Sequence, residues 1–268
     1  MTTKLPPPPK SAAPRQKRRR LLGRRRGQAM DPVLRSTSDG PIVDVPVNGR
    51  GKQPGRHRTM RDDSTQKIYD LHSRFYDATF GRLVRRRIGT AIVEQIKLKA
   101  GQIALDVGIG TGGSLDFWPR DRGTVVGVDL SGGMLDKAAD KVRESGRDNV
   151  HLGRCNALRL PFADAAFDSV FVSHVISVVS DPAAVLRECL RVAAPGARVV
   201  LVNHFQSENK VVGAIETLVC PICTKLGWKS DLALEDLLRS VDVHVEHRYK
   251  LTKPDLWETV VLVNKPRA

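Results

Sequence analysis

The chain has 268 residues, a formal net charge of +15 and a hydrophobic fraction of 41%. That fraction is large enough to bury a substantial core, so the chain as a whole is not intrinsically disordered. No run of about 18 apolar residues is present, which excludes helical membrane spans, and the basic N-terminus lacks the apolar segment of a secretory signal. Four cysteines without framework spacing fit a reducing compartment, so we expect a cytoplasmic protein.

Residues 1–61 are predicted to be a disordered basic tail. They hold 16 Lys and Arg against three Asp and so carry +13 of the net charge, whereas residues 62–268 carry only +2. The segment has a run of four prolines and two arginine blocks but no apolar periodicity, so burial cannot offset the entropy of ordering it. Such a tail is an alternative basis for nucleic-acid binding, although it has no aromatic residue on which bases could stack, and we expect no specific nucleic-acid partner.

Residues 62–100 predict an N-terminal cap of amphipathic helices. Two apolar stripes at helical spacing run through residues 64–99, interrupted by Gly81. Residues 64–100 carry eight basic and three acidic side chains, and half of the basic ones are Arg82, Arg85, Arg86 and Arg87. Basic amphipathic helices suit an anionic lipid surface, where each basic residue contributes about 1 kcal/mol. We therefore expect this cap to contact the inner face of the cell membrane.

Strands and helices alternate over residues 101–268. Apolar strands are predicted at residues 102–107, 124–129, 150–155, 169–172 and 198–202, with helices at 134–142 and 181–192. A helical insertion at 207–240 precedes two closing strands at 243–249 and 257–263. This order predicts an α/β fold with a doubly wound, mostly parallel, seven-stranded sheet.

The strongest chemical signal is the glycine-rich stretch after the first of these strands. Gly108, Gly110 and Gly113 fit the pattern G-x-G-x-x-G, in which the backbone approaches a nucleotide-like ligand closely. Asp129 ends the second strand, where a carboxylate can accept hydrogen bonds from a ribose diol. Asp106 precedes the glycines and would repel a pyrophosphate, but it suits the amino group and sulfonium of S-adenosylmethionine.

With these residues in place, residues 100–268 resemble the class I S-adenosylmethionine-dependent methyltransferases, which have a Rossmann-like fold. The resemblance implies S-adenosylmethionine as cofactor and no metal. It implies the following cofactor-binding residues: Asp106, Gly108, Gly110, Gly112, Asp129, Leu130, Met134, Asn156 and Ala157. Asn156 stands where the family commonly has Asp, so it keeps a hydrogen-bond acceptor but brings no charge.

Three further features resemble the bacterial phosphatidylethanolamine N-methyltransferases. They are the aromatic and acidic residues at 69–81, the segment 174–182, and the segment 201–205 with its continuation at 226–228. The resemblance implies a phospholipid acceptor, phosphatidylethanolamine, methylated in one or more rounds up to phosphatidylcholine by a peripheral enzyme at the membrane surface. Ubiquinone and menaquinone methyltransferases share the Tyr76-Asp77 pair, so a quinone or another small molecule is the alternative acceptor.

Methyl transfer to an amine requires that the nitrogen lose a proton, and two histidines are candidates to accept it. His204 and His174 follow strands beside the expected cofactor site. Tyr69 and Tyr76, on the cap, are candidates to close the site or to hydrogen-bond the headgroup. All four side chains also fit a packing role, and the sequence leaves that alternative open.

Overall fold

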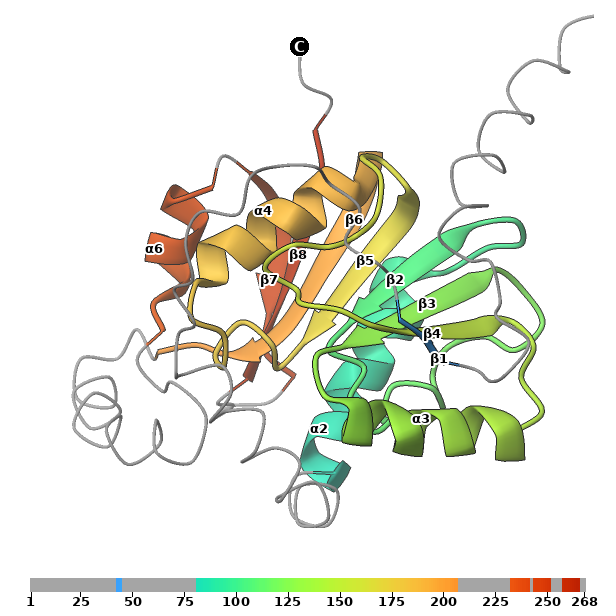
Figure 1. Ribbon diagram of the computed structural model, residues 1–268. Coiled ribbons are helices and arrows are strands. Elements are labelled where there is room, and N and C mark those ends of the chain that lie inside the picture. The colour runs from blue at the N-terminus through green and yellow to red at the C-terminus, as the bar shows by residue number, and fades with distance from the viewer. Residues whose placement is uncertain (1–41, 45–80, 207–231, 242, 252–256, 266–268) are drawn as a thin grey trace, which may run out of the picture.

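The structure, a computed structural model, describes residues 42–44, 81–206, 232–241, 243–251 and 257–265. Its centre is an eight-stranded sheet in the order β1-β4-β3-β2-β5-β6-β8-β7 (Figure 1). The strands are β1 (Ile42–Asp44), β2 (Ile103–Val107), β3 (Thr124–Asp129), β4 (Val150–Arg154), β5 (Phe167–Ser173), β6 (Ala193–His204), β7 (His244–Tyr249) and β8 (Trp257–Val263). The first six pair in parallel, and β8 and β7 are antiparallel. The α/β class and the mostly parallel sheet are confirmed.

One strand lies where the sequence predicts only a tail. β1 pairs in parallel with β4, and Ile42 stands opposite Leu152. Ile and Val favour extended backbone, and without β1 the strand β4 would form the sheet edge, with a row of unpaired backbone groups. The remainder of residues 1–61 lies outside the described residues.

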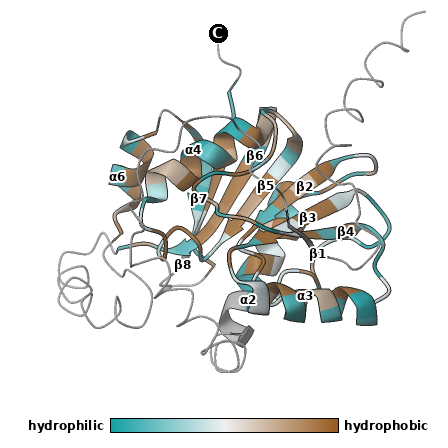
Figure 2. Ribbon diagram, viewed as in Figure 1, coloured by the Kyte–Doolittle hydropathy of each residue, from teal (hydrophilic) through white to brown (hydrophobic). Residues whose placement is uncertain are grey.

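Helices cover both faces of the sheet, as the doubly wound prediction requires. They are α2 (Gly81–Thr90), the π-helical segment η1 (Ala91–Ile96), α3 (Gly132–Glu144), α4 (Pro182–Val192) and α6 (Leu234–Arg239). The helices α2, η1 and α3 share one core with one face of the sheet, and α4 and α6 share a second core with the other. Figure 2 shows the apolar strands between these layers. No helix in the described part of the chain is long and apolar enough to cross a membrane.

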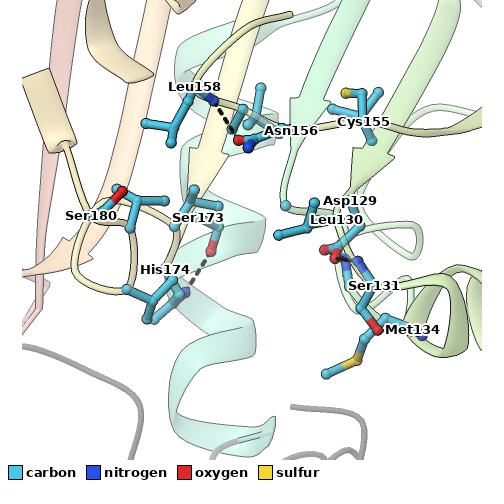
Figure 3. Close-up of a pocket in the computed structure, with 18 residues that line it drawn as sticks. Asp129, Leu130, Ser131, Met134, Cys155, Asn156, Leu158, Ser173, His174 and Ser180 are labelled. Atoms are coloured by element: carbon cyan, nitrogen blue, oxygen red, sulfur yellow. Dashed lines mark hydrogen bonds between the residues drawn. The ribbon is translucent and has the colours of Figure 1, made fainter. Parts of the chain in front are cut away.

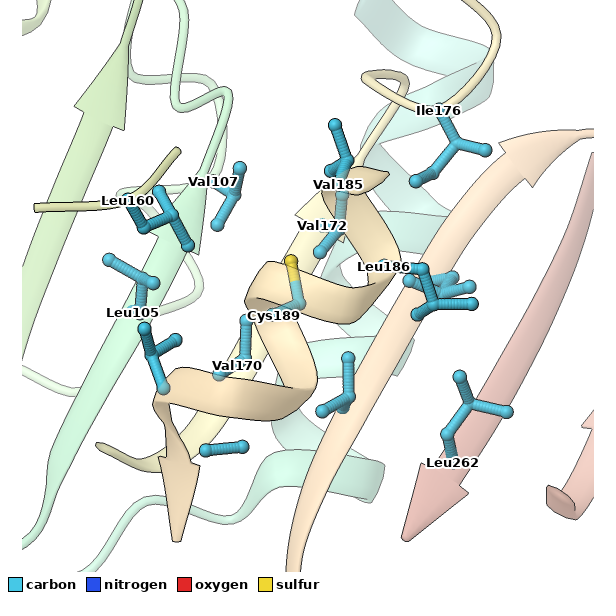
Figure 4. Packing of buried hydrophobic residues seen from close by; sticks show 14 of the residues in the cluster. Leu105, Val107, Leu160, Val170, Val172, Ile176, Val185, Leu186, Cys189 and Leu262 are labelled. Carbon is cyan, nitrogen blue, oxygen red and sulfur yellow. The ribbon is translucent and has the colours of Figure 1, made fainter. Parts of the chain in front are cut away.

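Helix caps fix where α3 and α4 begin. Ser131 accepts a hydrogen bond from the Met134 amide at 3.2 Å, and Asp181 accepts one from the Ala184 amide at 2.9 Å. Pro182 occupies the first turn of α4, where its missing N–H costs nothing. The buried side of α4 then packs on the central strands through Val185 and its helical neighbours (Figure 4).

The arginines predicted as one basic patch on the cap have different surroundings. Arg86 is exposed, and Arg85 forms an ion pair of 2.8 Å with Asp116. Arg87 is buried and lies over the ring of Trp257. The side chain of Arg82 lies outside what the structure describes. A single surface formed by all four is therefore not what the structure shows, because the helix turns Arg87 toward the sheet.

Arg147, which follows α3, forms hydrogen bonds to the segment after the glycine-rich loop. Its guanidinium is buried and donates to the carbonyl oxygens of Leu115, Trp118 and Pro119, the last two at 3.1 and 2.8 Å. Burial lowers the pKa of Arg147. Three carbonyl dipoles therefore stabilise this charge, and one side chain satisfies three backbone acceptors.

We predict that Arg147→Met lowers the free energy of unfolding by about 3 kcal/mol, because it removes the buried donor from the Leu115 and Trp118 carbonyls, whereas the Pro119 carbonyl keeps a hydrogen bond from Asn149 at 2.8 Å. The matched control is Arg143→Met, since Arg143 is exposed and pairs with Asp140 at 2.8 Å. This control substitution should lower the free energy of unfolding by less than about 1 kcal/mol. Urea unfolding of both variants measures the difference, and equal losses would show that the carbonyl contacts of Arg147 contribute nothing specific.

Candidate active site

A pocket opens at the carboxyl ends of the parallel strands, where ligands bind in open α/β sheets (Figure 3). Segments following β2, β3, β4 and β5 each contribute to its wall. The lining residues are Val107, Gly108, Gly110, Val128, Asp129, Leu130, Ser131, Met134, Cys155, Asn156, Ala157, Leu158, Ser173, His174, Val175, Val178, Val179 and Ser180. In Figure 3, Ser173 and His174 lie across the pocket from Asp129, Ser131 and Met134.

Glycine is required where the loop after β2 passes beneath this pocket. Gly108 has φ of +75°, and a Cβ built on it would lie 2.1 Å from Cγ2 of Val175. The amides of Gly108 and Ile109 both donate to the carbonyl of Val128, at 2.8 and 3.1 Å. The loop is therefore held at the end of β3, and it lies too close to Val175, after β5, for a side chain at Gly108.

Asp129 is held ready to accept hydrogen bonds from a ligand. Its Oδ2 accepts from the Gly110 amide at 3.0 Å, and its Oδ1 accepts from the Ser131 amide at 2.8 Å. Each carboxylate oxygen can accept more than one hydrogen bond, so both can also serve a diol. Leu130 and Met134 lie beside it in the pocket wall and add apolar surface.

Asn156 and Ala157 line the pocket, as the sequence predicts. The Asn156 side-chain oxygen accepts from the Leu158 amide at 2.9 Å, so it also shapes its own turn. Cys155 was not singled out from the sequence, although it directly follows β4. Burial, with the nearby charge of Asp129, raises the pKa of its thiol to about 12, so it stays protonated and unreactive.

Asp106 and Gly112 belong to the layer beneath the loop and are not among the described residues that line the pocket. Asp106 is buried, and its Oδ2 accepts from Ser114 Oγ at 2.6 Å and from Trp118 Nε1 at 2.8 Å. Burial raises its pKa to about 6 against the opposing effect of these hydrogen bonds, and Asp129 adds a smaller increase. At Gly112, φ is +77° and a Cβ would lie 2.7 Å from Leu115 Cδ1. Both residues thus support the loop from below.

His174 is the candidate proton acceptor that reaches the pocket. Its φ is +60°, an unfavourable backbone conformation that costs about 1–2 kcal/mol. Its Nδ1 lies 2.6 Å from Ser173 Oγ, and its buried Nε2 has no hydrogen-bond partner among the described residues. Burial lowers the pKa of His174 to about 4, and the charges of Arg87 and His204 lower it further. The imidazole is therefore neutral at neutral pH.

The other predicted catalytic residues are placed differently. His204 ends β6 and packs edge-on to Trp257 with ring centroids 6.5 Å apart, and it is not among the residues that line the pocket. Tyr69 and Tyr76 lie outside the described residues. The structure therefore brings His174, but not His204, to the predicted cofactor residues.

Known proteins share this arrangement. The family described as "Methyltransferase domain" matches residues 105–201. A phosphatidylethanolamine N-methyltransferase of Cereibacter sphaeroides is 37% identical over 180 residues, which are 66% of this chain and 85% of that protein. This chain belongs to the S-adenosylmethionine-dependent methyltransferases. The methyltransferase is also 37% identical over 154 residues to a ubiquinone/menaquinone biosynthesis C-methyltransferase of Vibrio vulnificus, of whose length it spans only 59%.

Solved structures agree on the fold. The [4+2]-cyclase SpnF superposes with a TM-score of 0.63 at 20% identity, over 76% of this chain and 95% of that protein. At such low identity the similarity shows the fold alone, and a cyclase on this fold illustrates that fold does not define the reaction.

The cofactor of this methyltransferase is S-adenosylmethionine, and the pocket residues fit it. The Gly108 turn leaves no side chain between the loop backbone and the pocket, as close approach to the methionine part requires. Asp129 would offer acceptors to the ribose hydroxyls, and Leu130, Met134 and Asn156, which line the pocket, would supply apolar and polar contacts for the adenine. Asp106 lies below this surface and supports the loop through its hydrogen bonds with Ser114 and Trp118.

We predict that Asp106→Asn stabilises the methyltransferase increasingly as the pH rises. The folded-state pKa of Asp106, about 6, lies above its ordinary value of 3.8, so the fold favours the protonated acid. The resulting stability is present below about pH 4 and is lost as the pH rises through about 6. Asn cannot ionise. The free energy of unfolding of the variant minus that of wild type should therefore increase by up to about 3 kcal/mol between about pH 4 and 7.

Urea unfolding at a series of pH values measures this difference. Asp140→Asn, which removes an exposed acid from α3, controls for the loss of one negative charge. A difference between Asp106→Asn and wild type that does not change with pH would contradict the assignment of a buried, protonatable carboxyl.

Proposed function

We propose that this methyltransferase transfers methyl groups to the amine of phosphatidylethanolamine, in one or more rounds. The resemblance to a phosphatidylethanolamine N-methyltransferase over 85% of that protein's length supports the acceptor. The observation that carries the chemistry is His174, a neutral imidazole with a buried, unpartnered Nε2 at the pocket wall.

The reaction requires that the amine and the methyl donor be aligned and that the amine nitrogen lose one proton. S-adenosylmethionine supplies a methyl group on a sulfonium, and the C–S bond breaks as the amine lone pair forms the new C–N bond. The pocket, with an apolar floor of Val107, Val128 and Val175, holds the reacting groups in line and keeps water out. The amine nitrogen must lose a proton, and His174 is positioned to accept it or to hold the amine by a hydrogen bond.

The Ser173 contact engages Nδ1 of His174 and leaves Nε2 for the proposed role. Nδ1 and Ser173 Oγ share a hydrogen bond of 2.6 Å. When Nδ1 carries the proton and donates it to the Ser173 oxygen, Nε2 keeps a lone pair for the amine. The neutral state of His174, which burial favours most, is the state in which that lone pair exists.

We predict that labelled S-adenosylmethionine, incubated with vesicles containing both phosphatidylethanolamine and a demethylated quinone, labels the aminophospholipid. His174→Gln should lower kcat about 100-fold, because general-base catalysis contributes about 10²–10⁴, while the affinity for S-adenosylmethionine stays unchanged. Lipid chromatography identifies the product and calorimetry measures cofactor binding. Label confined to the quinone would contradict the proposed acceptor and establish the C-methyltransferase alternative, which the Vibrio vulnificus relative favours.

We further propose that the methyltransferase meets its lipid by peripheral attachment to an anionic surface. The basic segment 1–61 carries +13, and on the cap Arg86 and Val93 are exposed, Val93 with 59% of its surface. A charged residue and an apolar residue on an outer helix suit a lipid interface.

Removal of residues 1–41 should weaken binding to vesicles of anionic lipid, because each basic residue near such a surface contributes about 1 kcal/mol. Sedimentation with anionic and with neutral vesicles measures this, and added salt should reduce the difference. Methylation of a short-chain phosphatidylethanolamine dissolved as monomer serves as the control and should not change. Equal binding to neutral and anionic vesicles would contradict the proposal.

A further inference from the structure

Helix α2 contacts the segment that follows the glycine-rich loop through one aromatic ring, that of Phe117. A Cβ built on Gly89 of α2 would lie 2.7 Å from Cε1 and 2.8 Å from Cδ1 of this ring. Four residues earlier, the guanidinium carbon of Arg85 lies 5.5 Å from the ring centroid, and Arg85 forms an ion pair of 2.8 Å with Asp116. Phe117 is partly buried and packs against the core that α2 and η1 share with the sheet. Two positions one helical turn apart on α2 therefore hold the same ring.

The helical backbone does not require glycine at Gly89. This residue lies inside the continuous helical run 81–96 formed by α2 and η1, and it is not among the glycines with positive φ. Alanine is the better helix former, because glycine loses more backbone entropy when it is ordered. The feature that requires glycine is the ring of Phe117, since a methyl group at Gly89 would overlap it.

The segment that carries the ring also supports Asp106. The Phe117 amide donates to the Ser114 carbonyl at 3.0 Å, which closes a turn. Within this turn Ser114 Oγ donates to Oδ2 of Asp106 at 2.6 Å, and directly after it Trp118 Nε1 donates to the same oxygen at 2.8 Å. A displacement of Phe117 would therefore move both donors to Asp106.

The same segment is continuous with the loop that lines the pocket. The Leu115 amide donates to the Gly112 carbonyl at 3.2 Å, and the Gly112 amide donates to the Ile109 carbonyl at 3.0 Å. Between these positions the Gly110 amide donates to Asp129 at 3.0 Å, and both Gly110 and Asp129 line the pocket. Helix α2 is thus connected to the cofactor pocket by the chain itself and by hydrogen bonds.

We propose that Phe117, supported by Gly89, is a positioning residue for S-adenosylmethionine. The ring holds segment 114–118 in place, so that the glycine-rich loop keeps the conformation that binds the cofactor. A loop already held in its binding conformation loses less conformational freedom when the ligand binds, which raises the affinity. Neither residue is among those that line the pocket, so both act through the loop. The inference concerns the cofactor and does not depend on which acceptor is methylated.

An exchange of side-chain size between the two positions tests the contact. Gly89→Ala places a methyl group against the ring, and Phe117→Val removes the Cδ and Cε atoms that this methyl group would meet. The double variant combines both changes. The control is Glu94→Ala, at an exposed position on η1. Calorimetry with the full chain measures the Kd for S-adenosylmethionine, and urea unfolding shows whether each variant is folded.

We expect Gly89→Ala to raise the Kd for S-adenosylmethionine about 10-fold, which lies within the range of coupling between residues in contact. Phe117→Val should also raise the Kd, because segment 114–118 loses its support. The double variant should bind more tightly than Gly89→Ala alone, because the overlap is gone, and Glu94→Ala should match wild type. An unchanged Kd in Gly89→Ala, or fold-changes that simply multiply in the double variant, would overturn the proposal.

The indole N–H of Trp118 supplies a readout that a general loss of stability would not move. Its resonance in a proton–nitrogen correlation spectrum reports the hydrogen bond to Asp106, and Trp118→Phe identifies the resonance by removing it. Gly89→Ala should shift this resonance, and the double variant should return it toward the wild-type position. A raised Kd without such a shift would overturn the proposed route through segment 114–118. If Gly89→Ala does not fold, Phe117→Val alone decides, and a wild-type Kd in that variant would contradict the proposal.

Discussion

The tight turn after β2 is the constraint on which the site depends. Two amides of this turn donate to the Val128 carbonyl, and a third, from Gly110, donates to Asp129. The turn thus joins the ends of β2 and β3 and orients Asp129 in the pocket wall. Gly108 passes so close to Val175 that the same turn also fixes its distance from the segment after β5, where His174 lies. Cofactor residues and candidate proton acceptor are therefore held by one piece of backbone.

The described part of the domain contains three buried charged groups, and each is accommodated in a different way. Asp106 is stabilised by two neutral donors and by its ability to take up a proton. Arg147 is stabilised by three backbone carbonyls. Arg87 lies over an aromatic ring. Because an uncompensated buried charge is costly, these groups are expected to be more sensitive to substitution than exposed charged residues such as Arg86 and Asp140.

The sequence was informative where a local pattern determines the structure. Strand periodicity and the glycine spacing located β2, β3 and the cofactor pocket, because backbone conformation there follows from short-range chemistry. The placement of Asp106 away from the pocket depends on Trp118 and Ser114, partners that spacing alone does not identify. The sequence did indicate that Arg87 is buried. Arg87 stands four residues before Ala91, so on a helix both side chains lie on the same buried face. The contact of Arg87 with Trp257 joins distant parts of the chain, and no local sequence pattern predicts it.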